Sequence, residues 1–236
     1  MKTKKKSAHS TVLTLVQLAM LIAIEAVFCF TPLGSVPIGP MVATFAMIPV
    51  IIAAILLGTW AGTFMGFVAG LFSFLVWTFM PPASSAMFAF VYTPFYTLGE
   101  FQGNVWSLVI CFLPRILTGT FAGLIYAGLS KGLAKMRARE NGHTSKVGAF
   151  FRDRAGLEYA VAAAVGSLTN TLLVLGGVFL FFGPEYAAAG GIGYELLLGI
   201  LGLTILTNGV PEMIVCILAA EGICRPLKKQ LRRWSV

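Results

Sequence analysis

Long apolar runs dominate this chain, and short polar or proline-rich stretches separate them. A helix needs about 20 apolar residues, each rising about 1.5 Å, to cross the hydrocarbon core of a membrane. Six runs qualify or nearly qualify, and they are residues 11–30, 42–58, 60–80, 105–129, 159–182 and 195–221. The pattern therefore predicts an all-α bundle of six transmembrane helices. Only Gly58 and Thr59 separate the second and third helices, which should form a tight hairpin.

Composition and charge agree with this prediction and orient the bundle. The chain of 236 residues is 58% hydrophobic and 11% charged, whereas a soluble domain usually carries about 25% charged residues. All but one of its 17 Lys and Arg residues fall within 2–6, 131–154 and 225–233. Basic residues gather on the cytoplasmic flanks of membrane helices. We therefore expect a multi-pass protein of the cell membrane with both termini cytoplasmic.

The same charge pattern divides the chain into three parts. We expect a cytoplasmic basic tail, a single membrane domain and a second cytoplasmic basic tail, over residues 1–10, 11–222 and 223–236. The connections that would then face outside contain no Lys or Arg, and they are residues 31–41, 81–104 and 183–194. Their lack of positive charge supports the orientation.

Sequence motifs give no support for an enzyme. The chain has no Gly-Lys dipeptide and therefore no phosphate-binding Walker A loop, and it has no HExxH motif. Its four cysteines lie in or beside apolar runs without a CxxC pair, and its two histidines fall in polar flanks. Such cysteines usually behave as small buried hydrophobes. We expect no catalysis, no cofactor and no metal ion in this chain.

Small residues mark close contacts between helices. Glycines recur every four residues at positions 58, 62, 66 and 70, which puts them on one helix face where a neighbouring backbone can approach. We favour packing inside the bundle over a dimer interface for this stripe. Ala19 and Ala23 form a second small pair, on the first helix, which could meet either the rest of the bundle or a partner protein.

Arg115 is the basic residue outside the three clusters, and it should lie near the middle of the bilayer. It follows Pro114, which leaves the carbonyl of Ile110 without its helical donor. A buried guanidinium offers five donors that suit a carboxylate. That carboxylate could belong to Glu25 or Glu212, as an internal ion pair, or to a bound ligand. The sequence leaves both interpretations open.

Two asparagines are expected at a similar depth. Asn170 lies in the fifth helix and Asn208 in the sixth, each about halfway across. We favour a polar pocket floor formed with Arg115, although each amide could instead join two helices. Aromatic residues of the 81–104 connection could form an interfacial belt or wall the pocket, and we favour the wall for Tyr92 and Phe95.

The order of four segments resembles the substrate-binding S component of energy-coupling factor (ECF) vitamin transporters, most closely the branch assigned pantothenate. The segments are "FTPLGSVPIGP", "IPVIIAAILLGTWAG", "FLPRILTG" and "SLTNTLLVL", and the resemblance covers about residues 11–222. It implies a six-helix bundle that binds a vitamin near its outer face. It also implies partners, namely a transmembrane coupling (T) component and two ATPase subunits, which would use the ATP.

The resemblance also implies roles for particular residues. The family's first-helix AxxxA motif docks on the coupling protein and matches Ala19 and Ala23. The loop between the first two helices closes over the ligand in the family. It matches residues 33–40 here, with Leu33, Gly34, Pro37, Ile38 and Gly39 as candidate contacts. This chain departs from the expected pattern at Thr59, where a proline would be expected after the hairpin glycine.

Pantothenate suits the candidate pocket chemically, because it is a small anion rich in hydroxyl and amide groups. Riboflavin, folate, hydroxymethylpyrimidine and pyridoxine types of vitamin stay open as alternatives. Two other classes also stay open. One is a stand-alone secondary transporter of a small organic anion, and the other is a structural membrane subunit that binds no small molecule.

Overall fold

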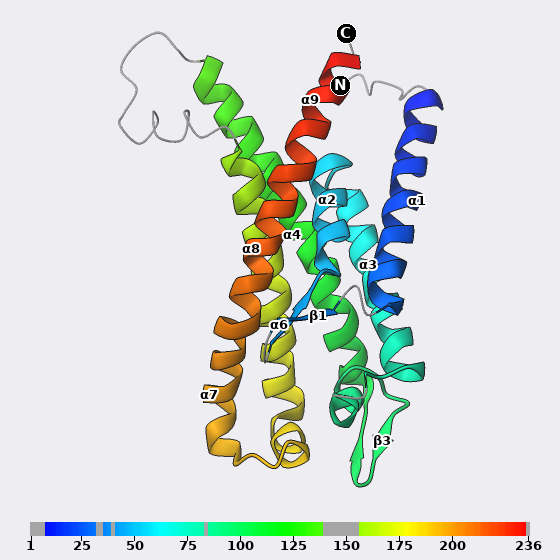
Figure 1. Ribbon diagram of the computed structural model, residues 1–236, viewed down its shortest axis with the longest axis vertical. Helices are drawn as coiled ribbons and strands as arrows, with labels where there is room; N and C mark the ends of the chain where they lie inside the picture. The colour runs from blue at the N-terminus through cyan, green and yellow to red at the C-terminus, as the bar shows by residue number, and fades with distance from the viewer. Residues whose placement is uncertain (1–7, 32–34, 39–40, 83–84, 139–155, 235–236) are drawn as a thin grey trace.

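The computed structural model of the chain describes residues 8–31, 35–38, 41–82, 85–138 and 156–234 (Figure 1). Within this part the fold is all-α, apart from two short β-hairpins. The long helices are α1 (Ala8–Phe30), α3 (Thr59–Phe79), α4 (Val105–Ala138) and α6 (Leu157–Ala189). A last, continuous rod consists of α7 (Tyr194–Thr204), η3 (Ile205–Gly209), α8 (Val210–Ala219), η4 (Ala220–Cys224) and α9 (Arg225–Trp234).

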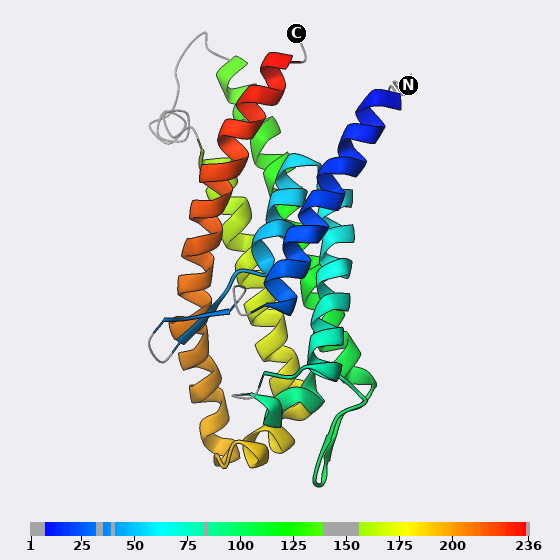
Figure 2. The ribbon, with the colours of Figure 1, turned by 45° about the vertical axis from the view of Figure 1, so that its right-hand side comes forward.

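Five segments of the described chain are long and apolar enough to cross a membrane, which makes this a multi-pass membrane protein. They lie in α1, α3, α4, α6 and the last rod. The helices run side by side along the long axis, and α1 begins at the same end of the bundle where α9 ends (Figures 1 and 2). The basic clusters predict that this end faces the cytoplasm.

The second predicted helix is shorter than expected. Its first residues instead form β2 (Met41–Thr44), which pairs antiparallel with β1 (Ser35–Ile38) in the register Ser35↔Thr44. The helix α2 (Met47–Leu56) has 10 residues, so it spans only about 15 Å. Valine and threonine of β2 favour extended backbone, but α2 is itself rich in isoleucine and valine, so residue preference does not set the boundary. Where six spans were predicted, the described chain therefore has five helical segments long enough to cross a membrane and one shorter apolar helix, α2.

The predicted 81–104 connection contains short elements at the end of the bundle opposite the start of α1 (Figure 2). A 3₁₀ helix, η2 (Ala86–Val91), is followed by the hairpin of β3 (Thr97–Leu98) and β4 (Phe101–Gln102). Phe90 and Val91 of η2 are fully buried. They pack in one cluster with Ile110 of α4 and with Val178 of α6. The connection is therefore part of the packed structure.

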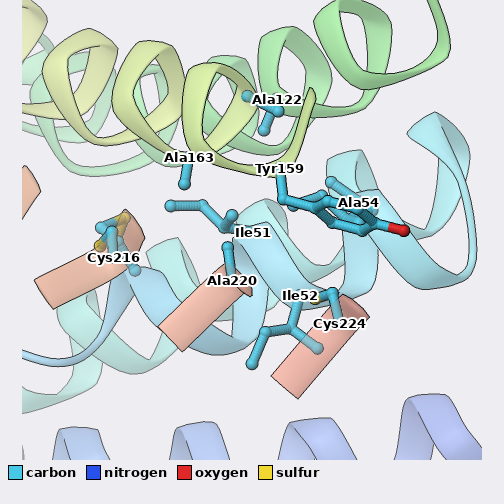
Figure 3. Close-up of a cluster of buried hydrophobic side chains, with 12 residues drawn as sticks. Ile51, Ile52, Ala54, Ala122, Tyr159, Ala163, Cys216, Ala220 and Cys224 are labelled. Carbon is cyan, nitrogen blue, oxygen red and sulfur yellow. The ribbon is translucent and has the colours of Figure 1, made fainter. Parts of the chain in front are cut away.

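The short helix α2 lies at the centre of the bundle. Figure 3 shows Ile51 and Ile52 of α2 among side chains from α4, α6 and the last rod, including Ala122, Tyr159 and Cys216. Nearly every residue of α2 is buried. Because it contacts helices on all sides, α2 joins the other elements into one core.

Three glycines of the stripe, Gly62, Gly66 and Gly70, lie inside the bundle against α4, as favoured from the sequence, whereas a Cβ atom on Gly58 would meet no atom within 4 Å. A Cβ atom at Gly62 would lie 2.8 Å from the carbonyl oxygen of Gly119 in α4, and one at Gly66 would strike the carbonyl of Arg115. Thr63 and Thr120 add a hydrogen bond of 2.8 Å between the same two helices. The α3 and α4 backbones are thus in direct contact, which only glycine permits at these positions.

We predict that Gly66→Ala destabilises the protein. The added methyl group has no space between α3 and the Arg115 carbonyl, and overpacking of this kind costs about 1–3 kcal/mol. Thermal unfolding of the purified protein in detergent measures the loss.

Gly128→Ala in α4 is the matched control, because a Cβ atom there meets no atom within 4 Å. It should keep or slightly raise the unfolding temperature, since alanine favours helix over glycine by about 1 kcal/mol. Equal unfolding temperatures for Gly66→Ala and Gly128→Ala would contradict the close contact of α3 and α4.

Candidate functional site

A cavity of about 330 Å³ lies inside the bundle, lined by α1, α2, α3, α4, α6 and the last rod. Most of its wall is apolar. Its polar and titratable lining side chains are Cys29, Thr31, Ser73, Tyr92, Arg115, Asn170, Thr171, Thr204, Asn208 and Glu212. The cavity is the one place in the described structure where the predicted Arg115, Asn170 and Asn208 meet. An apolar cavity with a few convergent polar groups is the usual form of a small-molecule site.

Arg115 is held by two hydrogen bonds to protein groups. Its Nη1 donates to the carbonyl oxygen of Ile110 at 2.9 Å, and its Nη2 donates to Ser73 Oγ at 3.4 Å. The carbonyl of Ile110 is the one that Pro114 leaves without a helical donor. The ring centre of Tyr92 lies 6.0 Å from the guanidinium carbon. The Nε atom of Arg115 is buried without a hydrogen-bond partner.

The internal ion pair that the sequence left open is not what the structure shows for Arg115. Its two hydrogen bonds go to a carbonyl and a hydroxyl, and neither goes to Glu25 or Glu212. Glu25 is fully buried in α1, and its Oε1 accepts a hydrogen bond from Cys29 Sγ at 3.4 Å. The Oε2 atom of Glu25 is buried without a hydrogen-bond partner. The guanidinium therefore faces the cavity without a carboxylate bonded to it.

Asn170 and Asn208 line the cavity from neighbouring elements, α6 and η3. These elements approach closely at the next residues, because a Cβ atom on Gly209 would lie 2.9 Å from Cγ2 of Thr171. The Oδ1 atom of each asparagine is buried and has no hydrogen-bond partner. Buried amides without partners are costly in a membrane protein. Such groups are common where a ligand completes the hydrogen bonding.

The π-helical turn η3 has a cause in the sequence. Pro211 follows Asn208 closely and has no N–H, so a regular helical bond to the carbonyl of Thr207 cannot form. The helix widens to a π-turn over Ile205–Gly209 at this point. Single π-turns of this kind often mark functional sites within longer helices. Here the turn carries Asn208, which lines the cavity.

Tyr92 forms part of the cavity wall, directly after η2. The ring of Trp77 stacks on it with the ring centres 4.5 Å apart. Burial raises the pKa of Tyr92 to about 12, so its phenol stays protonated and neutral at physiological pH. Phe95 does not line the cavity. It is 75% exposed and meets Phe74 edge-on, because the chain turns outward after Pro94.

The remaining sequence candidates belong to the connection after α1 and to α1 itself. Leu33, Gly34 and Gly39 are outside the described residues, and Pro37 and Ile38 belong to strand β1. Ala19 and Ala23 are exposed on α1. The sequence reasoning missed Ser73 and Trp77. A signal for Ser73 was present, because it lies three residues after Gly70 and seven after Gly66, on the face that meets α4.

One catalytic pattern in the sequence is excluded by its position. Residues 128–132, "GLSKG", match the GxSxG pattern of serine hydrolases. In those enzymes the serine lies on a sharp turn between a strand and a helix. Here the whole segment lies within α4, and Ser130 Oγ donates to the carbonyl oxygen of Ala127 at 3.3 Å. Ser130 is therefore not placed as the nucleophile of a serine hydrolase.

A bundle of apolar helices around a mostly apolar cavity with a few convergent polar groups is typical of a membrane protein that binds a small molecule. A family model for the ECF transporter, substrate-specific component, matches residues 13–224. The chain therefore belongs to the family of ECF transporter S components. It is also 30% identical to the "Pantothenic acid transporter PanT" of Lactococcus lactis subsp. cremoris (strain MG1363) over 228 residues, which is 96% of this chain and 97% of that protein.

We predict that Glu25→Gln leaves the free energy of unfolding within about 1 kcal/mol of the wild-type value. Glutamine keeps an oxygen acceptor for Cys29, and it removes a carboxyl group whose second oxygen has no partner. Breaking a buried ion pair would instead cost about 3–5 kcal/mol. Thermal or denaturant unfolding in detergent distinguishes the two values.

Glu25→Ala serves as the comparison, because it removes both the carboxyl group and its packing volume. It should lower stability through the cavity that it creates. A loss of 3 kcal/mol or more in Glu25→Gln itself would mean that Glu25 is the counter-ion of Arg115 after all.

Proposed function

We propose that this chain is the pantothenate-binding subunit of an ECF importer. It captures the vitamin at the outer face of the membrane and delivers it together with a T component and two ATPase subunits. The observation that carries the proposal is the position of Arg115 in the internal cavity, with no carboxylate among its hydrogen-bond partners. A partly buried cation at membrane depth favours an anion as its partner, and a carboxylate ligand supplies one.

The rest of the cavity suits the remaining groups of pantothenate. The vitamin carries an amide and two hydroxyl groups besides its carboxylate. Asn170, Asn208, Thr171 and Thr204 provide amides and hydroxyls along the wall, and these groups can donate and accept hydrogen bonds. The cavity volume of about 330 Å³ lies within the usual range for small-molecule sites. The relative named for pantothenic acid transport supports the same ligand.

Capture from outside follows from the charge pattern. The described basic residues at the end of α4 and in α9 lie at the end where α1 begins, and such clusters remain on the cytoplasmic side. Tyr92 and Pro82, from the connection at the opposite end, line the cavity. In this proposal the segment with Leu33, Gly34, Pro37, Ile38 and Gly39 closes over the bound vitamin. Its prolines restrict the open segment already, so less conformational entropy is lost when it closes.

Energy for transport comes from partner subunits in this proposal. The chain has no Gly-Lys dipeptide and therefore no Walker A loop that could bind ATP. Its family is that of the substrate-specific component of ECF transporters. Ala19 and Ala23 lie exposed on one side of α1. Small residues spaced by four allow another helix to approach closely. They provide the docking surface for the T component.

We predict that Arg115→Gln lowers the affinity for pantothenate by at least about 30-fold, since removing one partner of a buried charge pair costs about 2–5 kcal/mol. The affinity for pantothenol should change much less, because an alcohol replaces the carboxylate in that compound. Glutamine keeps a hydrogen-bonding side chain at the cavity wall without burying a charge, so the fold should persist. Calorimetric titration of the subunit in detergent gives both affinities.

Arg225→Gln is the matched control, because it removes the charge of an exposed arginine far along the last rod. It should bind like the wild type. An Arg115→Gln variant that still prefers pantothenate over pantothenol would exclude Arg115 as the carboxylate partner. Tight binding of riboflavin, folate, hydroxymethylpyrimidine or pyridoxine instead would assign the subunit to another vitamin.

We also predict that Ala19→Leu with Ala23→Leu leaves pantothenate binding intact but reduces uptake. The larger side chains cover the small surface that a partner helix needs, while the cavity lies on the other side of α1. Uptake is measured in proteoliposomes that contain the T component and both ATPase subunits.

Ile24→Phe adds bulk at a different exposed position of α1, and it should transport normally. Unchanged uptake by the double variant would remove this surface from the docking site. Uptake by the subunit alone, driven by an ion gradient, would favour the stand-alone transporter instead.

A further inference from the structure

We infer that Pro114 is the positioning residue of Arg115. Pro114 has no backbone N–H, so the carbonyl of Ile110 is left to accept a hydrogen bond from the Arg115 guanidinium. This hydrogen bond fixes the orientation of the guanidinium. The effect on ligand selectivity rests on the proposed function, whereas the effect on the guanidinium itself does not.

The helix α4 contains one proline, at Pro114. In a regular α-helix the N–H of residue 114 would donate to the carbonyl of Ile110, four residues earlier. Proline has no N–H, so this carbonyl needs another donor. Arg115 Nη1 supplies it, at 2.9 Å. A side chain of α4 thus replaces a backbone hydrogen bond of the same helix.

This replacement turns the guanidinium toward the preceding turn of its own helix. Ile110 is nearly fully buried, at 2% exposure, so its carbonyl depends on a protein donor. Arg115 Nη2 donates the second hydrogen bond, of 3.4 Å, to Ser73 Oγ on the neighbouring helix α3. The two contacts use two of the five N–H groups and hold the plane of the guanidinium between α3 and α4.

The backbone of Arg115 is fixed as well. Gly66 of α3 lies so close to the Arg115 carbonyl that any side chain at position 66 would strike it. The Cα atom and the charged end of Arg115 are therefore both held before a ligand arrives. A long side chain that is already ordered loses less conformational freedom on binding, and this preserves affinity.

Pro114→Ala tests the inference. Alanine restores the backbone N–H, which then competes for the Ile110 carbonyl, and the guanidinium loses its fixed acceptor. The ratio of pantothenate affinity to pantothenol affinity should fall about 3- to 10-fold, the range expected when one side chain must be ordered on binding. In the Arg115→Gln background, Pro114→Ala should leave this ratio unchanged.

Pro184→Ala is the matched control. Pro184 also lies inside a helix, α6, and it does not line the cavity. The ratio should stay at the wild-type value in this variant. If the wild type prefers pantothenate and Pro114→Ala keeps the same preference, the inference is overturned.

A second measurement needs no ligand. Phenylglyoxal modifies guanidinium groups that are not engaged, and mass spectrometry of the ligand-free subunit in detergent gives the rate of modification at Arg115. This rate should rise several-fold in Pro114→Ala and stay unchanged in Pro184→Ala. An unchanged rate in Pro114→Ala overturns the inference. If the wild type binds neither vitamin compound, the proposed function fails, while the modification rate still decides the role of Pro114.

Discussion

The direct contact between the backbones of α3 and α4 is the constraint on which the cavity depends. Between two helices in a membrane there is little hydrophobic driving force, because lipid tails are as apolar as the side chains. Close packing must then come from small residues and from polar contacts. Gly62 and Gly66 provide the close approach, and the hydrogen bond between Thr63 and Thr120 lies beside them. This contact brings Ser73 of α3 within reach of Arg115 of α4.

Buried polar groups explain why the interior has its particular arrangement. An arginine or carboxyl group inside a membrane protein is tolerated only where protein groups or a cavity surround it. Arg115 meets a carbonyl and a hydroxyl, and Glu25 meets a thiol. Asn170 and Asn208 keep oxygens without partners. Arg115 and the two asparagines thus line one cavity, and Glu25 lies one helical turn before Cys29, which lines it too.

The sequence predicts the long helices well, because each depends only on local hydrophobicity over some 20 residues. It predicts the glycine packing for a similar reason, since the spacing of four defines a face. It could not predict where α2 begins, because a short apolar run is compatible with a strand and with a helix alike. It also identified the orphaned Ile110 carbonyl without assigning Arg115 to it. That pairing depends on side-chain geometry across one turn, and a carboxylate partner was equally compatible with the residues.

The shortness of α2 explains why the bundle can contain a cavity at all. A helix of 10 residues covers about 15 Å, roughly half of the hydrocarbon thickness of about 30 Å. A full-length helix would also fill the space before the first turn of α2. Here that space stays open, and neighbouring helices line it. Phe28 and Cys29 near the end of α1, and Ala46 and Met47 at the start of α2, line the cavity. The strands β1 and β2 connect these two ends. The same truncation therefore leaves space for the cavity and places β1 and β2 between the two helix ends that line it.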